Sequence, residues 1–106
     1  ADKSLRQYAE SKIFAPLGMK NTHFHDDHTM IVPNRATGYS PSRAGFRINM
    51  STLDMVGDGG VYTTVEDLAK WDANFYSRAA GGRLIGALQT PGPKREAGHY
   101  ALGLLQ

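Results

Sequence analysis

The stretch "GDGGVYTTVEDLAKWDANF", residues 57–75, carries the clearest secondary-structure signal in the chain. Glycines lead into a pair of threonines, and an amphipathic pattern with acidic residues in its first turn follows. Thr63 or Thr64 can cap a helix here, and Glu66 would complete a capping box with Thr63. We expect the helix to end at the glycine pair 81–82.

The apolar residues of this helix predict which of its faces is buried. Val65, Leu68, Trp71 and Phe75 recur at helical spacing, and Asp72 is the polar member of the same stripe. A tryptophan on the inner face of an amphipathic helix packs in a core more often than it stacks on a substrate. We therefore interpret Trp71 as a core residue.

The flanking sequence predicts fewer regular elements. Ser4 and Gln7 have the spacing of a capping box at the start of an N-terminal helix. Residues 20–60 have no long periodic pattern and are rich in turn-forming residues, which predicts loops with short strands. Three further elements are expected: helices over residues 4–15 and 84–89, and a strand over residues 99–106.

Composition excludes several classes of protein. The 106 residues have a hydrophobic fraction of 41%, a net charge of +2 and a mean hydropathy of -0.41, values typical of a globular protein. The basic residues are scattered, so we expect no nucleic-acid partner. No apolar run reaches membrane length, so no membrane segment is expected. The absence of cysteine excludes thiolate zinc sites and cysteine nucleophiles.

Four segments together resemble the serine beta-lactamase-like hydrolases, the family of class C beta-lactamases, DD-peptidases and related esterases. The resemblance implies an α+β fold, specifically a partial beta-lactamase/transpeptidase-like fold with a helical lid region and a piece of the antiparallel sheet. The segments follow the family's order: "IFAPLGMKNTHF" (13–24), "NRATGYSP" (34–41), "GDGGVYTTVEDLAKWDANF" (57–75) and "HYALGLL" (99–105).

The resemblance also implies acyl transfer through an active serine, assisted by a lysine and a tyrosine. The motifs that carry this chemistry are S-x-x-K, Y-x-N or Y-x-S, and a late K-T-G or H-x-G. None occurs in the 106 residues, so we assign no catalytic residue, and we expect no cofactor. A serine without an adjacent base is a weak nucleophile, so the chain alone is expected to be inactive.

In the family these motifs lie before and after the matching segments. We therefore expect residues 1–106 to be a single interior fragment that lacks both flanks and packs on the remainder of its own domain. The intact protein would be a bacterial hydrolase, periplasmic or secreted, with a small-molecule acyl substrate: a beta-lactam, a peptide or an ester. An alternative is a non-catalytic binding module derived from the same fold.

The glycine-rich approach to the main helix matches a family segment near the active-site edge. The resemblance implies that Asp58, Gly59 and Gly60 form a rim of the substrate pocket. A tight turn, in which glycine permits positive φ and close packing, explains the same residues, and we favour that interpretation.

A histidine cluster offers a different function. His23, His25, Asp27 and His28 spell H-x-H-x-D-H, the metal-binding signature of the metallo-beta-lactamase fold, and imidazole with carboxylate suits zinc. In that fold the motif follows a buried apolar strand, whereas "PLGMKN" precedes it here. We therefore expect a polar surface loop with no metal, and keep a metal-binding protein as the alternative.

Overall fold

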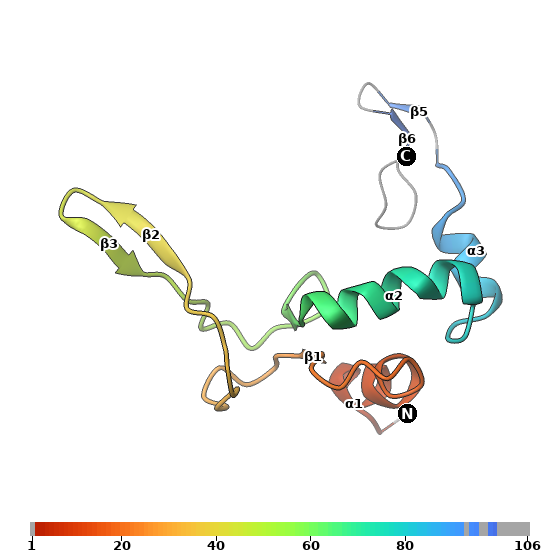
Figure 1. Ribbon diagram of the computed structural model, residues 1–106, viewed down its shortest axis with the longest axis horizontal. Helices are drawn as coiled ribbons and strands as arrows, with labels where there is room; N and C mark the ends of the chain where they lie inside the picture. The colour runs from red at the N-terminus through yellow and green to blue at the C-terminus, as the bar shows by residue number, and fades with distance from the viewer. Residues whose placement is uncertain (1, 93, 96–97, 100–106) are drawn as a thin grey trace.

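The computed structural model describes residues 2–92, 94–95 and 98–99. Within them, helices and three two-stranded antiparallel sheets form an α+β arrangement (Figure 1). The helical segments are α1 (Leu5–Ala9), the π-helix η1 (Glu10–Phe14), α2 (Val65–Ser77) and α3 (Arg83–Leu88). The strands are β1 (His23–Phe24), β2 (Tyr39–Ser42), β3 (Gly45–Ile48), β4 (Val61–Tyr62), β5 (Lys94–Arg95) and β6 (Gly98–His99).

The N-terminal helix forms as its caps predict. The Ser4 hydroxyl accepts the Gln7 N–H, and the Gln7 side chain accepts the Ser4 N–H, which completes the capping box. α1 then continues into the π-helix η1, where the Ala15 N–H reaches back five residues to the Glu10 carbonyl at 2.9 Å. The helix predicted over residues 4–15 is confirmed, as two successive segments.

The start of α2 selects one of the two predicted caps. Thr64 is the N-cap residue, and its hydroxyl accepts the Asp67 N–H at 3.3 Å. The expected box between Thr63 and Glu66 is wrong, because the Thr63 hydroxyl is engaged elsewhere, 2.8 Å from the hydroxyl of Thr22.

The end of α2 also differs from the prediction. The helix ends at Arg78, which adopts the left-handed conformation with φ 53°, before the glycine pair is reached. Asn74 explains this early end. Its side chain donates to the Ala80 carbonyl at 3.1 Å and accepts the Ala80 N–H at 2.8 Å, which turns the chain back over the helix terminus. The short helix predicted over residues 84–89 is confirmed as α3.

α2 turns its polar side, not its predicted apolar stripe, toward the described chain. Asp67 and Asn74 are fully buried, whereas Val65 and Leu68 are exposed. The predicted inner face is therefore wrong for most of its members. Trp71 and Phe75 are the exceptions: both are half-buried, Trp71 packs against the core as expected, and the Phe75 ring lies 5.5 Å from the Trp71 ring.

The core is small and lies between η1, the turn that follows it and α2. Ala9, Phe14 and Met19 form its buried centre. Partly buried apolar residues pack around this centre: Ile13, Leu17, Phe24 and Trp71. The rings of Phe14 and Phe24 lie 6.1 Å apart, which joins the helical turn to strand β1.

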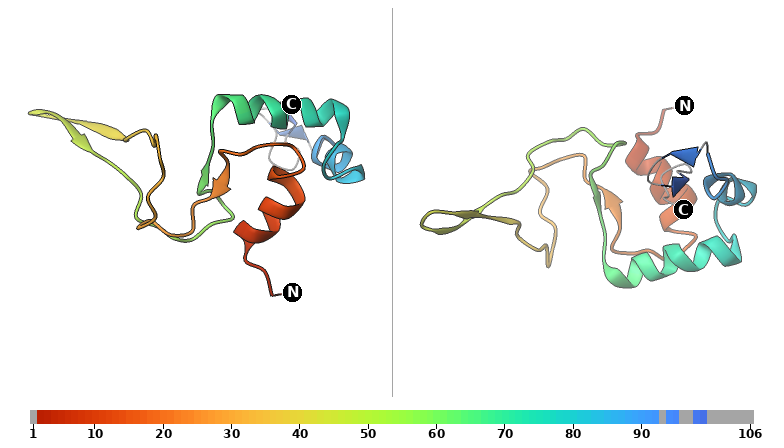
Figure 2. Two further views of the ribbon diagram at one scale, coloured as in Figure 1. Left: turned by 60° about the horizontal axis from the view of Figure 1, so that its bottom comes forward. Right: turned by 90° about the horizontal axis from the view of Figure 1, so that it is seen from above.

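The predicted loop region holds short strands, as expected. β1 pairs with β4, placing His23 opposite Tyr62 and Phe24 opposite Val61, and this pairing brings residues distant in the sequence together just before α2. β2 and β3 form a hairpin that projects away from the helices in all three views (Figures 1 and 2). Of the strand predicted over residues 99–106, only His99, in β6, lies within the described residues.

Candidate functional site

A buried carboxylate fixes the turn after η1 against α2. Asp67 accepts hydrogen bonds from the Asn21 N–H at 2.7 Å, the Thr22 hydroxyl at 2.9 Å and the Lys70 ammonium at 2.7 Å. Lys70 also donates to the Gly18 carbonyl at 2.7 Å. Burial alone would raise the pKa of Asp67, but these donors outweigh it, so the pKa lies below its ordinary value. The carboxylate is thus ionised and fully paired at neutral pH.

Strand β1 carries the first histidine pair beside this contact. His23 Nε2 lies 3.2 Å from His25 Nδ1, and the buried His25 ring stacks on Tyr62 with centroids 4.1 Å apart. The guanidinium of Arg35 lies 4.9 Å from the centroid of the same tyrosine ring. Burial, with the nearby charge of Arg6, holds the pKa of His23 below its ordinary value. His23 is therefore neutral at pH 7, and the ring of His25 packs against Tyr62.

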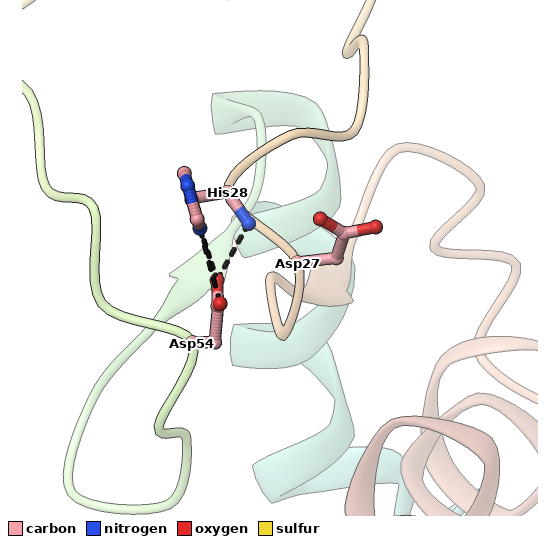
Figure 3. A group of neighbouring side chains, drawn as sticks. All are labelled: Asp27, His28 and Asp54. Atoms are coloured by element: carbon pink, nitrogen blue, oxygen red, sulfur yellow. Dashed lines mark hydrogen bonds and ion pairs between the residues drawn. The ribbon is translucent and has the colours of Figure 1, made fainter.

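The second half of the histidine cluster makes a different contact. His28 donates its backbone N–H to Asp54 at 2.6 Å, and its Nδ1 lies 2.9 and 3.0 Å from the two oxygens of that carboxylate. Figure 3 shows both interactions meeting at Asp54, with the Asp27 carboxylate pointing away from the pair. Asp27 instead accepts from the N–H and hydroxyl of Thr29.

These hydrogen bonds lower the pKa of both exposed carboxyl groups. Asp54 is affected chiefly by the His28 N–H, and Asp27 chiefly by the Thr29 hydroxyl. Asp27, His28 and Asp54 could each offer one ligand atom within 4.8 Å of the others. All three side chains are exposed and already hydrogen-bonded, so their contacts account for the geometry of the loop without an ion.

The four residues of the H-x-H-x-D-H signature do not converge. His23 and His25 pair beneath β4, whereas Asp27 and His28 lie on the exposed loop with Asp54. Within the described residues, the group that could hold a metal excludes both His23 and His25. Asp54 is a partner that the sequence did not indicate.

The glycine-rich turn has the geometry that a tight turn requires. Gly60 has φ 77°, its carbonyl accepts the His25 N–H at 2.7 Å, and an added Cβ would lie 2.9 Å from Val56 Cγ1. Gly59 has open space around its Cα. Asp58 is exposed. Gly60 therefore fixes the path of the turn. This structural role does not depend on whether Asp58, Gly59 and Gly60 form a pocket rim.

A cavity lies beside β1, and His23 is among the residues that line it. It has a volume of about 930 Å³ and is lined by residues of α1, β4 and the loop around residues 30–36. Arg6, Lys20 and Arg35 give its wall a positive character, although Arg6 is paired with Asp26 at 2.8 Å. Asp58, Gly59 and Gly60 do not line this cavity.

No helix among the described residues has the length and apolarity needed to cross a membrane.

Comparison with known proteins defines the class to which this arrangement belongs. The family model described as Beta-lactamase matches residues 1–101. The chain therefore belongs to the beta-lactamase family, in agreement with the resemblance found in its sequence.

Solved structures support the same fold. The octameric penicillin-binding protein homologue from Pyrococcus abyssi superposes with a TM-score of 0.77 at 26% identity, over 94% of this chain and 24% of that one. A penicillin binding protein from Bacillus halodurans gives a TM-score of 0.76 at 24% identity, over 92% of this chain and 32% of that one. The chain thus spans about a quarter of the length of the first structure and about a third of the length of the second. Curated proteins gave no match.

Proposed function

We propose that residues 1–106 are the lid and pocket-wall segment of a serine beta-lactamase-like hydrolase that works by acyl transfer. In this proposal the nucleophilic serine, its lysine and the tyrosine lie outside these residues, because the chain contains no S-x-x-K or Y-x-N. The segment is then inactive alone and contributes shape to a site whose chemistry the remainder of the domain performs. The substrate is a small acyl compound: a beta-lactam, a peptide or an ester.

The orientation of α2 is the observation that carries this proposal. The exposed fractions of Val65, Leu68 and Tyr76 are 76%, 48% and 83%, whereas those of Asp67 and Asn74 are 0% and 1%. A helix of a globular protein normally buries its apolar stripe and exposes its polar face. Here buried polar and exposed apolar side chains occur on the same helix. A second layer of protein over the exposed apolar side chains would explain this arrangement.

The overall dimensions support the same inference. The radius of gyration is 16.6 Å, against about 13 Å for a compact domain of this length. Among the described residues few apolar side chains are buried, and large ones such as Met55 and Leu84 are 79% and 70% exposed. A chain with so little buried apolar surface gains little hydrophobic stabilisation by itself.

The polar contacts of α2 suggest how the segment contributes to a site. Asp67 and its donors hold the turn at residues 18–22 against the helix, and β4 lies next to that turn. The glycine-rich turn 58–60 leads directly into β4. We include Asp58, Gly59 and Gly60 in the proposed pocket rim, with Gly60 fixing the path of the turn.

The proposal is tested by mapping the reactive serine in the protein at its natural length. The protein is incubated with a fluorescent penicillin or a fluorophosphonate, digested, and analysed by mass spectrometry, with residues 1–106 alone as the control. The expected adduct lies on a serine outside residues 1–106, and the control remains unlabelled. An adduct on a serine within residues 1–106 would refute the proposal, and a protein without any adduct would favour the binding module.

A further inference from the structure

The β2–β3 hairpin separates its apolar and polar side chains onto two faces. Its register places Tyr39 opposite Ile48 and Pro41 opposite Phe46. Directly opposed residues in an antiparallel pair share one face of the sheet. These four side chains therefore form a continuous apolar surface, which we call the hairpin face: Tyr39, Pro41, Phe46 and Ile48.

The hairpin face is open to solvent. Phe46, Ile48 and Tyr39 are 76%, 71% and 60% exposed. Figures 1 and 2 show the hairpin extending away from α1 and α2, so its variants can be made without disturbing the core. Contiguous exposed apolar surface of this kind marks an interaction site.

Charge around the hairpin indicates what kind of partner it fits. Residues 29–53 contain three arginines, Arg35, Arg43 and Arg47, and no acidic residue. Arg43 lies in the turn of the hairpin and Arg47 lies on the polar face, opposite Ser40. Among the described residues, neither of these two arginines makes an ion pair. The complementary surface is therefore anionic as well as apolar.

We propose that the hairpin face docks on an anionic phospholipid surface. Aromatic and aliphatic side chains such as Phe46 and Ile48 enter the boundary between headgroups and acyl chains, as in interfacial amphipathic elements. A two-stranded hairpin is thin, so arginines at its turn and on its outer face stay within about a Debye length, roughly 8 Å, of the headgroup charges. Their long side chains can also reach toward the headgroups.

A protein layer fits this surface less well than lipid does. A protein layer that enclosed both faces of the hairpin would remove Arg43 and Arg47 from water, and each would then need a carboxylate supplied by that layer. Lipid contacts the hairpin face alone and leaves both arginines at the level of the headgroups. The docking of the hairpin on lipid is independent of the proposed hydrolase function.

Vesicle sedimentation tests the proposal with the protein at its natural length. The vesicles are phosphatidylcholine alone, or phosphatidylcholine with phosphatidylglycerol in a ratio of about 70:30. We expect binding to the anionic vesicles that weakens as salt is raised, and little binding to the neutral ones. Replacing both Arg43 and Arg47 by serine is expected to weaken binding about 25-fold, at about fivefold for each charge.

The apolar contribution is tested with a matched pair of variants. The double variant Phe46→Ser, Ile48→Ser is expected to weaken vesicle binding by about tenfold or more, because less apolar surface is inserted. Ile31→Ser, which alters an exposed apolar residue outside the hairpin, is expected to leave binding unchanged.

Three results would overturn the proposal. The first is equal binding to neutral and anionic vesicles, or no binding to either. The second is unchanged binding by the Phe46→Ser, Ile48→Ser variant. The third is a fall in the thermal midpoint of that variant by several degrees without lipid, because this would show that protein of the same or a second chain already covers the hairpin face.

Discussion

Asp67 and Asn21 are joined by a 2.7 Å hydrogen bond from the asparagine backbone N–H to the aspartate carboxylate, across 46 residues of sequence. The carboxylate is fully buried and accepts two further donors, from Thr22 and Lys70. The contact joins the N-terminal turn to α2 and so determines where β1 and β4 meet.

Replacing Asp67 by alanine should destabilise the protein strongly. The change leaves the Asn21 N–H, the Thr22 hydroxyl and the Lys70 ammonium without their acceptor, at a cost of about 3–5 kcal/mol. Urea denaturation of the protein at its natural length measures the loss. Glu66→Gln, in the adjacent exposed position, is the control, and a loss no larger than that of the control would show that the contact is unimportant.

The lowered pKa of Asp67 predicts acid sensitivity. Because the folded pKa lies below the unfolded value, the stabilisation is complete above the unfolded pKa of about 4 and is lost as pH falls through the folded pKa. Unfolding free energies measured from pH 6 to pH 2.5 should decrease more steeply for the wild type than for Asp67→Asn. Parallel curves below pH 4 would contradict the assignment.

Replacement by alanine should have different effects on stability at Gly59 and at Gly60. Gly60→Ala should destabilise by about 1–3 kcal/mol, because it combines positive φ with a close approach to Val56. Gly59→Ala meets no neighbour and should change stability by less than about 0.5 kcal/mol. Thermal unfolding of the two variants checks this difference, and equal midpoints would contradict it.

The Asp27, His28 and Asp54 contact should be insensitive to metal. We expect equal thermal midpoints after dialysis against a chelator and after addition of one equivalent of zinc, because the exposed groups are held by hydrogen bonds among themselves and to Thr29. His28→Gln should then leave the thermal midpoint almost unchanged, as is usual for the loss of an exposed ion pair. A zinc-dependent rise in the midpoint that His28→Gln abolishes would establish a metal site instead.

Local signals in the sequence predicted the secondary structure well. The Ser4–Gln7 capping box spans three residues, so its geometry follows from the sequence alone. The family and the α+β fold were likewise predictable, because the matching segments keep their order through the chain.

Contacts between distant residues could not be predicted in the same way. The amphipathic pattern of α2 predicted burial wrongly for Val65, Leu68 and Asp72, because the rule assumes that the described chain supplies the whole core. The burial of Asp67 depends on donors from residues 21 and 22, and His28 finds Asp54 at a separation of 26 residues. No local sequence pattern indicates the contact of Asp67 with residues 21 and 22 or the contact of His28 with Asp54. The histidine signature suggested one cluster, whereas the pairing of β1 with β4 separates it into two.

Hydroxyl-radical footprinting of α2 measures whether further protein covers its exposed apolar residues. The labelling of Val65, Leu68 and Tyr76 is compared between the protein at its natural length and residues 1–106 alone, with the exposed Ile31 as a reference. We expect strong protection of Val65, Leu68 and Tyr76 at natural length, because the remainder of a beta-lactamase-like domain covers them. Equal labelling in both samples would contradict it, because the apolar stripe would then be exposed in the whole protein.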